Sequence, residues 1–71
     1  MQKGICHVAQ IPLRGEPQSS AEMVSQLLFG ETYTISTRQE DWYHVTMDFD
    51  GYTGWLSKSS FQECILADRY V

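Results

Sequence analysis

Residues 43–56 read YHVTMDFDGYTGWL, and this stretch predicts a β-hairpin. Its first half places an apolar side chain at every second position from 43 to 47, which is the period of a strand with one buried face. Asp50 and Gly51 follow, and both tolerate the positive φ of a tight turn. We therefore expect residues 52–56 to pair back against the first strand.

Short strands separated by turn signals are expected along the rest of the chain. The expected extended segments cover residues 4–9, 11–14, 32–36, 42–47, 52–56 and 61–65. Residues 24–29 are mostly apolar, but their apolar positions follow neither the period of a strand nor that of a helix. Ser20 could begin one helical turn. Residues 58–60 suit a 3₁₀ turn. Five or six short strands predict an all-β fold, a small, strongly bent barrel with at most a 3₁₀ turn.

Large side chains have to fill the core of such a barrel, because a chain of 71 residues buries only about 60% of the surface of its unfolded form. Aromatic residues make up 13% of the sequence and can fill it. The alternation within the strands predicts that the core includes Tyr33, Ile35, Tyr43, Val45 and Met47.

The charge balance argues against nucleic acid as a partner. Nine acidic residues face five basic ones, and the basic residues are scattered rather than clustered as phosphate binding requires. No apolar run approaches the ~20 residues of a membrane span, and no apolar signal segment follows Met1. We expect a cytoplasmic protein; the alternative is a periplasmic or extracellular one whose signal peptide is missing from this sequence.

Two cysteines lie near the two ends of the sequence. In a cytoplasmic protein Cys6 and Cys64 are expected to be free thiols, whereas in a small secreted domain they could form one disulfide. No two cysteines are closely spaced, so no structural zinc site is expected. Asp48 and Asp50 could hold a cation or merely solvate their turn, but two carboxylates fall far short of a calcium site. We expect neither a metal nor a cofactor.

A catalytic nucleophile beside a base is not expected either. Cys6 and His7 are neighbours on a predicted strand, so their side chains point to opposite faces. Cys6 and His44 could meet only through a tertiary contact. We therefore expect no catalytic residue in this chain.

The aromatic residues are the better indicators of a binding surface. Trp42 lies off the buried face of its strand, where it can line a binding groove or cover a loop. Tyr52 and Trp55 are three residues apart around Gly54. Unless Gly54 introduces a bulge, one of the two side chains is expected inside the barrel and the other available to a ligand.

Four motifs occur in a fixed order: IPLRGEPQS at 11–19, EMVSQLLFGE at 22–31, DW at 41–42 and DGYTGWL at 50–56. Together they resemble the bacterial SH3 (SH3b) domain that precedes NlpC/p60-type cysteine peptidase domains. The resemblance covers roughly residues 4–61. It implies an SH3-like barrel over residues 1–64, with residues 65–71 as the start of a linker to a downstream domain.

The peptidases of that family are γ-D-glutamyl-L-diamino acid endopeptidases, which cut the stem peptides of peptidoglycan. Their nucleophilic Cys and its His lie in the domain that follows the SH3b module. The resemblance therefore implies a non-catalytic part of a hydrolase. Its implied partners are the downstream peptidase domain, on which it docks and whose substrate cleft it helps to shape, and peptidoglycan stem peptide fragments.

The resemblance also implies site residues. Tyr52, in a Tyr-x-Gly-Trp motif, is the implied phenol donor at one end of the substrate cleft, and Trp55 closes that motif. Arg14, Glu16 and Pro17 match an Arg-x-Glu-Pro element. Arg14 and Glu16 share one face of an extended segment, so they could present a charge pair to a neighbouring domain, or pair with each other and only fix the loop.

Two other functions stay open at this point. The domain could bind peptidoglycan or an extended peptide by itself, through Trp42 and neighbouring aromatic residues. Alternatively, it could be a structural or oligomer-forming domain that dimerises through its edge strands.

Overall fold

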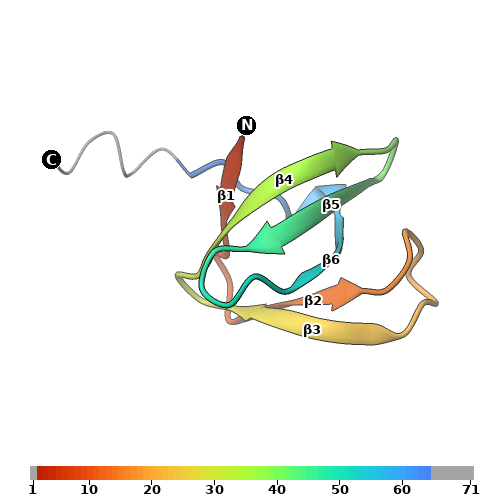
Figure 1. Cartoon of the computed structure of the whole chain (residues 1–71), viewed down its shortest axis with the longest axis horizontal. Helices are drawn as coiled ribbons and strands as arrows, with labels where there is room; N and C mark the ends of the chain where they lie inside the picture. Colours follow the sequence, from red (N-terminus) through yellow and green to blue (C-terminus); the bar gives the residue numbers. More distant parts are fainter. Residues whose placement is uncertain (1, 65–71) are drawn as a thin grey trace, which may run out of the picture.

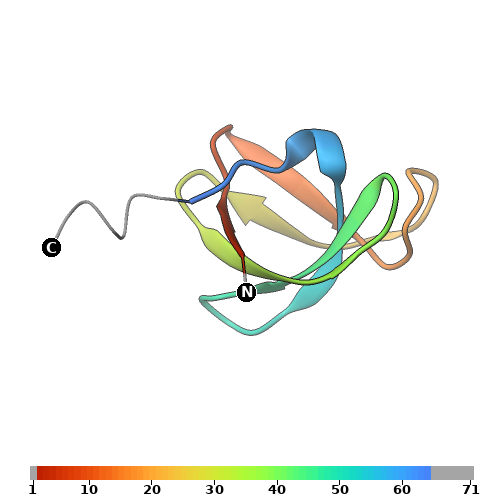
Figure 2. The same ribbon diagram turned by 90° about the horizontal axis from the view of Figure 1, so that it is seen from above.

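Six antiparallel strands form one sheet that curls into a barrel in the computed structural model, which describes residues 2–64 (Figures 1 and 2). The elements are β1 (Lys3–Ile5), β2 (Gln10–Arg14), β3 (Met23–Leu28), β4 (Thr32–Arg38), β5 (Trp42–Met47), β6 (Thr53–Ser57) and the 3₁₀ turn η1 (Lys58–Ser60). Their order across the sheet is β1-β4-β5-β6-β2-β3. The predicted all-β barrel is confirmed. The described residues contain no helix with the length and hydrophobicity that crossing a membrane requires.

The hairpin predicted from residues 43–56 is present as β5 and β6. Tyr43 pairs with Leu56 and Val45 with Gly54. The turn between the strands uses Gly51, whose φ of 79° lies in the left-handed region. The side chain of Asp50 accepts a hydrogen bond from the Tyr52 amide at 3.1 Å and so braces the turn.

The core lies inside the barrel and takes inward-facing residues from five strands and the β1–β2 connection. It consists of Cys6, Ile11, Leu13, Leu27, Tyr33, Ile35, Val45, Met47 and Leu56. The predicted core residues Tyr33, Ile35, Val45 and Met47 are buried, and Tyr43 is half-buried against the cluster.

Burial raises the pKa of Tyr33 to about 12, so its phenol stays neutral at ordinary pH. The nearby Gln62 backbone lowers the pKa of Tyr33, but by less than burial raises it. The Tyr33 hydroxyl has no hydrogen-bond partner of good geometry among the described residues.

Several predicted local elements are wrong. Ser20 does not begin a helical turn, because the Gly15 amide donates to the Glu22 carbonyl at 2.9 Å and closes the loop into a hairpin. Strand β1 ends at Ile5, since the backbone of Cys6 turns to bond Glu31 and Gly30. Residues 61–64 contribute one isolated bridge, between Gly4 and Glu63, instead of a strand. The predicted linker at 65–71, with Ile65 of the predicted strand, lies outside the described residues.

Strand β3 explains why residues 24–29 show no clear period. It forms one end of the sheet, and of its six residues only Leu27 is buried. The strand therefore has no continuous buried face to impose an alternation.

The connections between strands lie at two opposite ends of the barrel. The β2–β3 and β4–β5 loops lie together at one end, whereas the β3–β4 and β5–β6 turns lie at the other (Figures 1 and 2). The barrel therefore offers two separate surfaces for function. We call them the loop end and the turn end.

A polar network ties β1 to the turn end. The carboxylate of Asp48 accepts hydrogen bonds from Lys3 (2.7 Å), Thr32 (2.7 Å) and Thr34 (3.1 Å). Lys3 and Asp48 also form the only ion pair within residues 2–64. Partial burial works to raise the pKa of Asp48, but the three donors outweigh it and hold the pKa below its ordinary value of 3.8. Asp48 is thus fixed in structure and is not available as half of a cation site with Asp50.

This lowered pKa predicts an acid-sensitive contribution to stability. A carboxylate with a lower pKa in the folded state stabilises the fold fully above its unfolded pKa of 3.8, and the contribution is lost as the pH falls through the folded pKa. We expect the unfolding temperature to drop below about pH 4, and Asp48→Asn to be less stable at neutral pH and to show a flatter acid limb. Thermal unfolding against pH measures this. Asp41→Asn is the matched control, and an unchanged acid limb in Asp48→Asn would contradict the prediction.

Candidate functional site

A row of side chains crosses the outer face of the barrel. His44 pairs with Trp55 across β5 and β6, and Trp55 pairs with Arg14 across β6 and β2. The rings of His44 and Trp55 meet edge to face, with their centroids 4.9 Å apart. Trp42 stands two residues before His44 on the same face and is half-buried. We call Trp42, His44, Trp55 and Arg14 the outer row.

Ser36 fixes the orientation of the His44 ring. Its Oγ lies 3.0 Å from the His44 carbonyl oxygen and 2.9 Å from the ring Nδ1. The carbonyl can only accept, so the single hydroxyl proton of Ser36 goes to it. Nδ1–H of His44 therefore donates to the Ser36 oxygen, and in the neutral ring Nε2 keeps a lone pair that can accept a hydrogen bond from a ligand.

The β2–β3 loop borders the outer row at the loop end. The Arg14 guanidinium donates to the carbonyl of Ala21 at 3.3 Å, and the Gln18 amide donates to the carbonyl of Glu16 at 2.8 Å. Arg14 therefore fixes the loop, as one of the two sequence hypotheses stated, but its partner is a backbone carbonyl and not Glu16. Glu16 is exposed and Pro17 half-buried. The carboxylate of Glu16 thus stays available beside a braced loop.

A second surface lies at the turn end and is aromatic. Phe49 is 85% exposed, Phe29 is 73% exposed and Tyr52 is 62% exposed. Phe49 and Tyr52 flank the β5–β6 turn, and Phe29 lies in the β3–β4 turn. The Asp48 amide donates to the Thr32 carbonyl at 3.1 Å and joins the two turns. We call Phe29, Phe49 and Tyr52 the aromatic end.

The open edge of the sheet is partly covered. The Glu31 side chain accepts a hydrogen bond from the Leu28 amide at 2.8 Å, and the Glu31 amide donates to the Leu28 carbonyl at 2.9 Å. The edge of β3 that a second copy could pair with is therefore shortened to the part before Leu28.

The chain matches the sequence model of one known protein family. The model of the bacterial dipeptidyl-peptidase SH3 domain family matches residues 13–61, which include the end of β2, the whole of β3, β4, β5 and β6, and both surfaces. The chain belongs to this family. It is a bacterial SH3 domain of a kind associated with peptidases, as the sequence motifs indicated. No curated protein matches the chain.

In this SH3 domain the predicted site residues do not form one site. Trp42 and Trp55 lie on the outer row with Arg14, and Glu16 and Pro17 border it. Tyr52 belongs to the aromatic end. Trp42 pairs with Ser57, and Ser57 follows Tyr52 by five residues, a distance of roughly 17 Å in an extended strand. Trp42 and Tyr52 therefore lie far apart on the barrel.

The expectation that Tyr52 or Trp55 lies inside the barrel is wrong. The inward positions of β6 are taken by Gly54 and Leu56, so Trp55 is half-buried on the outer face. Tyr52 precedes the strand and is largely exposed. A Cβ on Gly54 would come within 2.7 Å of the Leu13 Cβ, so this glycine serves the close approach of β2.

Sequence reasoning missed Phe29, Phe49 and the orientation of His44. A large aromatic residue between two aspartates, as at Phe49, was a signal, because polar turns rarely carry such a side chain without a partner for it. Phe29 directly before the turn glycine Gly30 is a similar case. The contact of His44 with Ser36 depends on a β-bulge between Ile35 and Thr37, which no sequence pattern indicated.

The thiols of the SH3 domain are free. Cys6 is buried, with its Sγ 3.2 Å from the Val8 carbonyl oxygen, and Cys64 is half-buried. Cys6 lies inside the barrel and His44 on the outer face, so the two do not form a dyad. Within residues 2–64 no three His, Cys, Asp or Glu side chains gather as a metal site requires.

Proposed function

We propose that this SH3 domain is the non-catalytic module of a cell-wall peptide hydrolase. It docks on an NlpC/p60-type cysteine peptidase domain of the same polypeptide and helps to wall the cleft that takes peptidoglycan stem peptides. The aromatic end, in a member of a peptidase-associated SH3 family, is the observation that carries the proposal.

The chemistry of the aromatic end suits a domain interface. Phenylalanine and tyrosine are enriched where proteins meet, and the three residues belong to two turns that one backbone hydrogen bond joins. The turn that carries Phe49 is held by the Asp48 network and by the Asp50 side chain. A surface already fixed in its bound shape loses little conformational entropy on docking.

The two free cysteines agree with a reducing compartment. We therefore assign the action of the hydrolase to the cytoplasm, where peptidoglycan fragments are recycled. In a secreted protein the half-buried thiol of Cys64 would be open to oxidation.

Tyr52 is the residue that this function assigns to the substrate. Its side chain is 62% exposed at the aromatic end, so its hydroxyl can reach across the interface into the cleft. We expect Tyr52→Phe in the complete gene product to lower kcat/KM for L-Ala-γ-D-Glu-diamino acid substrates about three- to tenfold, which is the worth of one hydrogen bond. Steady-state kinetics measures this, with Tyr43→Phe as the control. Unchanged kcat/KM would remove Tyr52 from the site.

The outer row supports a second candidate, a module that binds a ligand by itself. Trp42 and Trp55 are both half-buried on one outer face, and aromatic faces of this kind bind extended peptides and sugars. Titration of the isolated domain with muropeptides, followed by tryptophan fluorescence, separates the two candidates. A saturable change favours the second, and none favours docking alone.

A further inference from the structure

A pocket on another part of the barrel belongs to neither surface. It has a volume of about 500 Å³ and is lined by Gln2, Ile35, Ser36, Thr37, Arg38 and Glu63. It forms where β4 passes the start of the chain, since the Ile35 amide donates to the Gln2 carbonyl at 2.9 Å. The bulge of β4 after Ile35 interrupts the regular pairing with β5 at this place.

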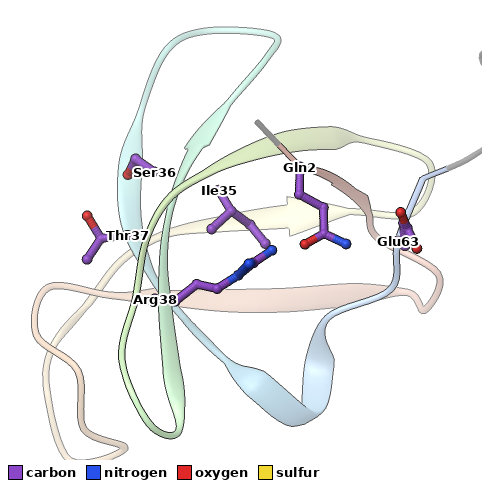
Figure 3. Close-up of a pocket in the computed structure, with 6 residues that line it drawn as sticks. All are labelled: Gln2, Ile35, Ser36, Thr37, Arg38 and Glu63. Atoms are coloured by element: carbon purple, nitrogen blue, oxygen red, sulfur yellow. The ribbon is translucent and has the colours of Figure 1, made fainter.

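The pocket carries opposite charges at its two sides. Figure 3 shows the Arg38 guanidinium and the Gln2 amide pointing toward one another, with Glu63 on the far side of Gln2. Arg38 and Glu63 do not pair, because the only ion pair within residues 2–64 joins Lys3 and Asp48. The Arg38 guanidinium lies 5.3 Å from the centroid of the Tyr43 ring, which holds the cation in place.

The two charges of the pocket come from distant points of the sheet. Glu63 bridges Gly4, and Gly4 pairs with Tyr33, so Glu63 lies two strand spacings, roughly 9.5 Å, to the side of β4. Arg38 lies five residues beyond Tyr33 along the same strand. Five residues correspond to roughly 16 Å, so the two backbones lie about 19 Å apart and only the side chains bring both charges to one pocket. An extended ligand with a positive and a negative end suits this arrangement better than a single amino acid, which carries both charges on one carbon.

We propose that this pocket binds a short zwitterionic peptide. Its carboxylate binds the fork of Arg38, its ammonium group binds Glu63, and its peptide group hydrogen-bonds the Gln2 amide. The buried Ile35 side chain forms an apolar floor beneath it. The volume falls within the range of small-molecule sites. This site goes beyond the docking function and does not depend on it.

The test is a titration of the ¹⁵N-labelled 71-residue chain with L-alanyl-L-alanine, followed by amide chemical shifts. We expect saturable shifts at Gln2, residues 35–38 and Glu63, with a Kd in the millimolar range because the charges are exposed. L-alanine, N-acetyl-L-alanyl-L-alanine and L-alanyl-L-alaninamide should each bind about tenfold more weakly or not at all, since each lacks one contact.

Variants that remove one charge at a time test which residues bind the ends of the peptide. Arg38→Gln and Glu63→Gln should each weaken binding about tenfold, and the controls Glu40→Gln and Lys58→Gln should leave it unchanged. The spectrum itself reports that each variant is folded. The proposal is overturned if no saturable shift occurs, if the blocked peptides bind equally well, or if neither pocket variant weakens binding. None of these results depends on whether a peptidase domain docks on the aromatic end.

Discussion

Gly4→Ala is expected to destabilise the fold by about 3 kcal/mol, at the upper end of the cost of overpacking a core. A Cβ on Gly4 would lie 2.4 Å from the Cε2 and Cζ atoms of the Tyr33 ring. Tyr33 is fully buried, and its ring also meets Phe61 edge to face at 6.4 Å, so it has little room to move. Thermal unfolding should show a Tm lower by roughly 12–24 °C.

A double-mutant cycle shows whether the ring is the cause. Leucine has no atoms at the positions of the tyrosine Cε2, Cζ and hydroxyl, so in a Tyr33→Leu background Gly4→Ala should cost less than about 1 kcal/mol. Gly51→Ala is the control: it has open space around it and a φ of 79°, and should cost about 1–2 kcal/mol in either background. An equal cost of Gly4→Ala in both backgrounds would show that the Tyr33 contact is not the reason.

Phe49→Ser is expected to lower kcat/KM of the complete gene product tenfold or more, because an aromatic anchor at the centre of an interface contributes about 2 kcal/mol. The same variant of the isolated chain should keep its stability within about 0.5 kcal/mol, since the Phe49 side chain is 85% exposed. Steady-state kinetics and thermal unfolding together measure the two effects.

Met23→Ser is the matched control for Phe49→Ser. Met23 is also exposed and apolar, but it begins β3 at the loop end, away from the aromatic end. We expect it to leave kcat/KM unchanged. Full activity in Phe49→Ser, or an equal loss in Met23→Ser, would contradict docking through the aromatic end.

The hairpin of β5 and β6 could be predicted from the sequence, because alternation and the Asp50-Gly51 turn are local signals. The barrel followed from the number of short strands. Strand β3 could not be predicted, since it lies at the edge of the sheet and has almost no buried face. The short β1 and the single bridge at Glu63 depend on contacts between the two ends of the chain, which no local pattern encodes.

The candidate site was predicted residue by residue, but its arrangement was not. The resemblance selected both Tyr52 and Arg14 without placing them relative to one another; the register places Arg14 opposite Trp55 and leaves Tyr52 at the other end of the barrel. The pocket between Arg38 and Glu63 was not foreseen either. Its two charges are far apart in the sequence, and β1 and β4 bring them to one place.

The most direct measurement of the central claim is hydrolysis of L-Ala-γ-D-Glu-diamino acid peptide under reducing conditions. The 71-residue chain and the complete gene product are compared at equal concentration. The account predicts cleavage at the γ-D-Glu bond by the complete product and none by the chain alone. Cleavage by the chain alone, or a complete product without a cysteine peptidase domain and without activity, would contradict it.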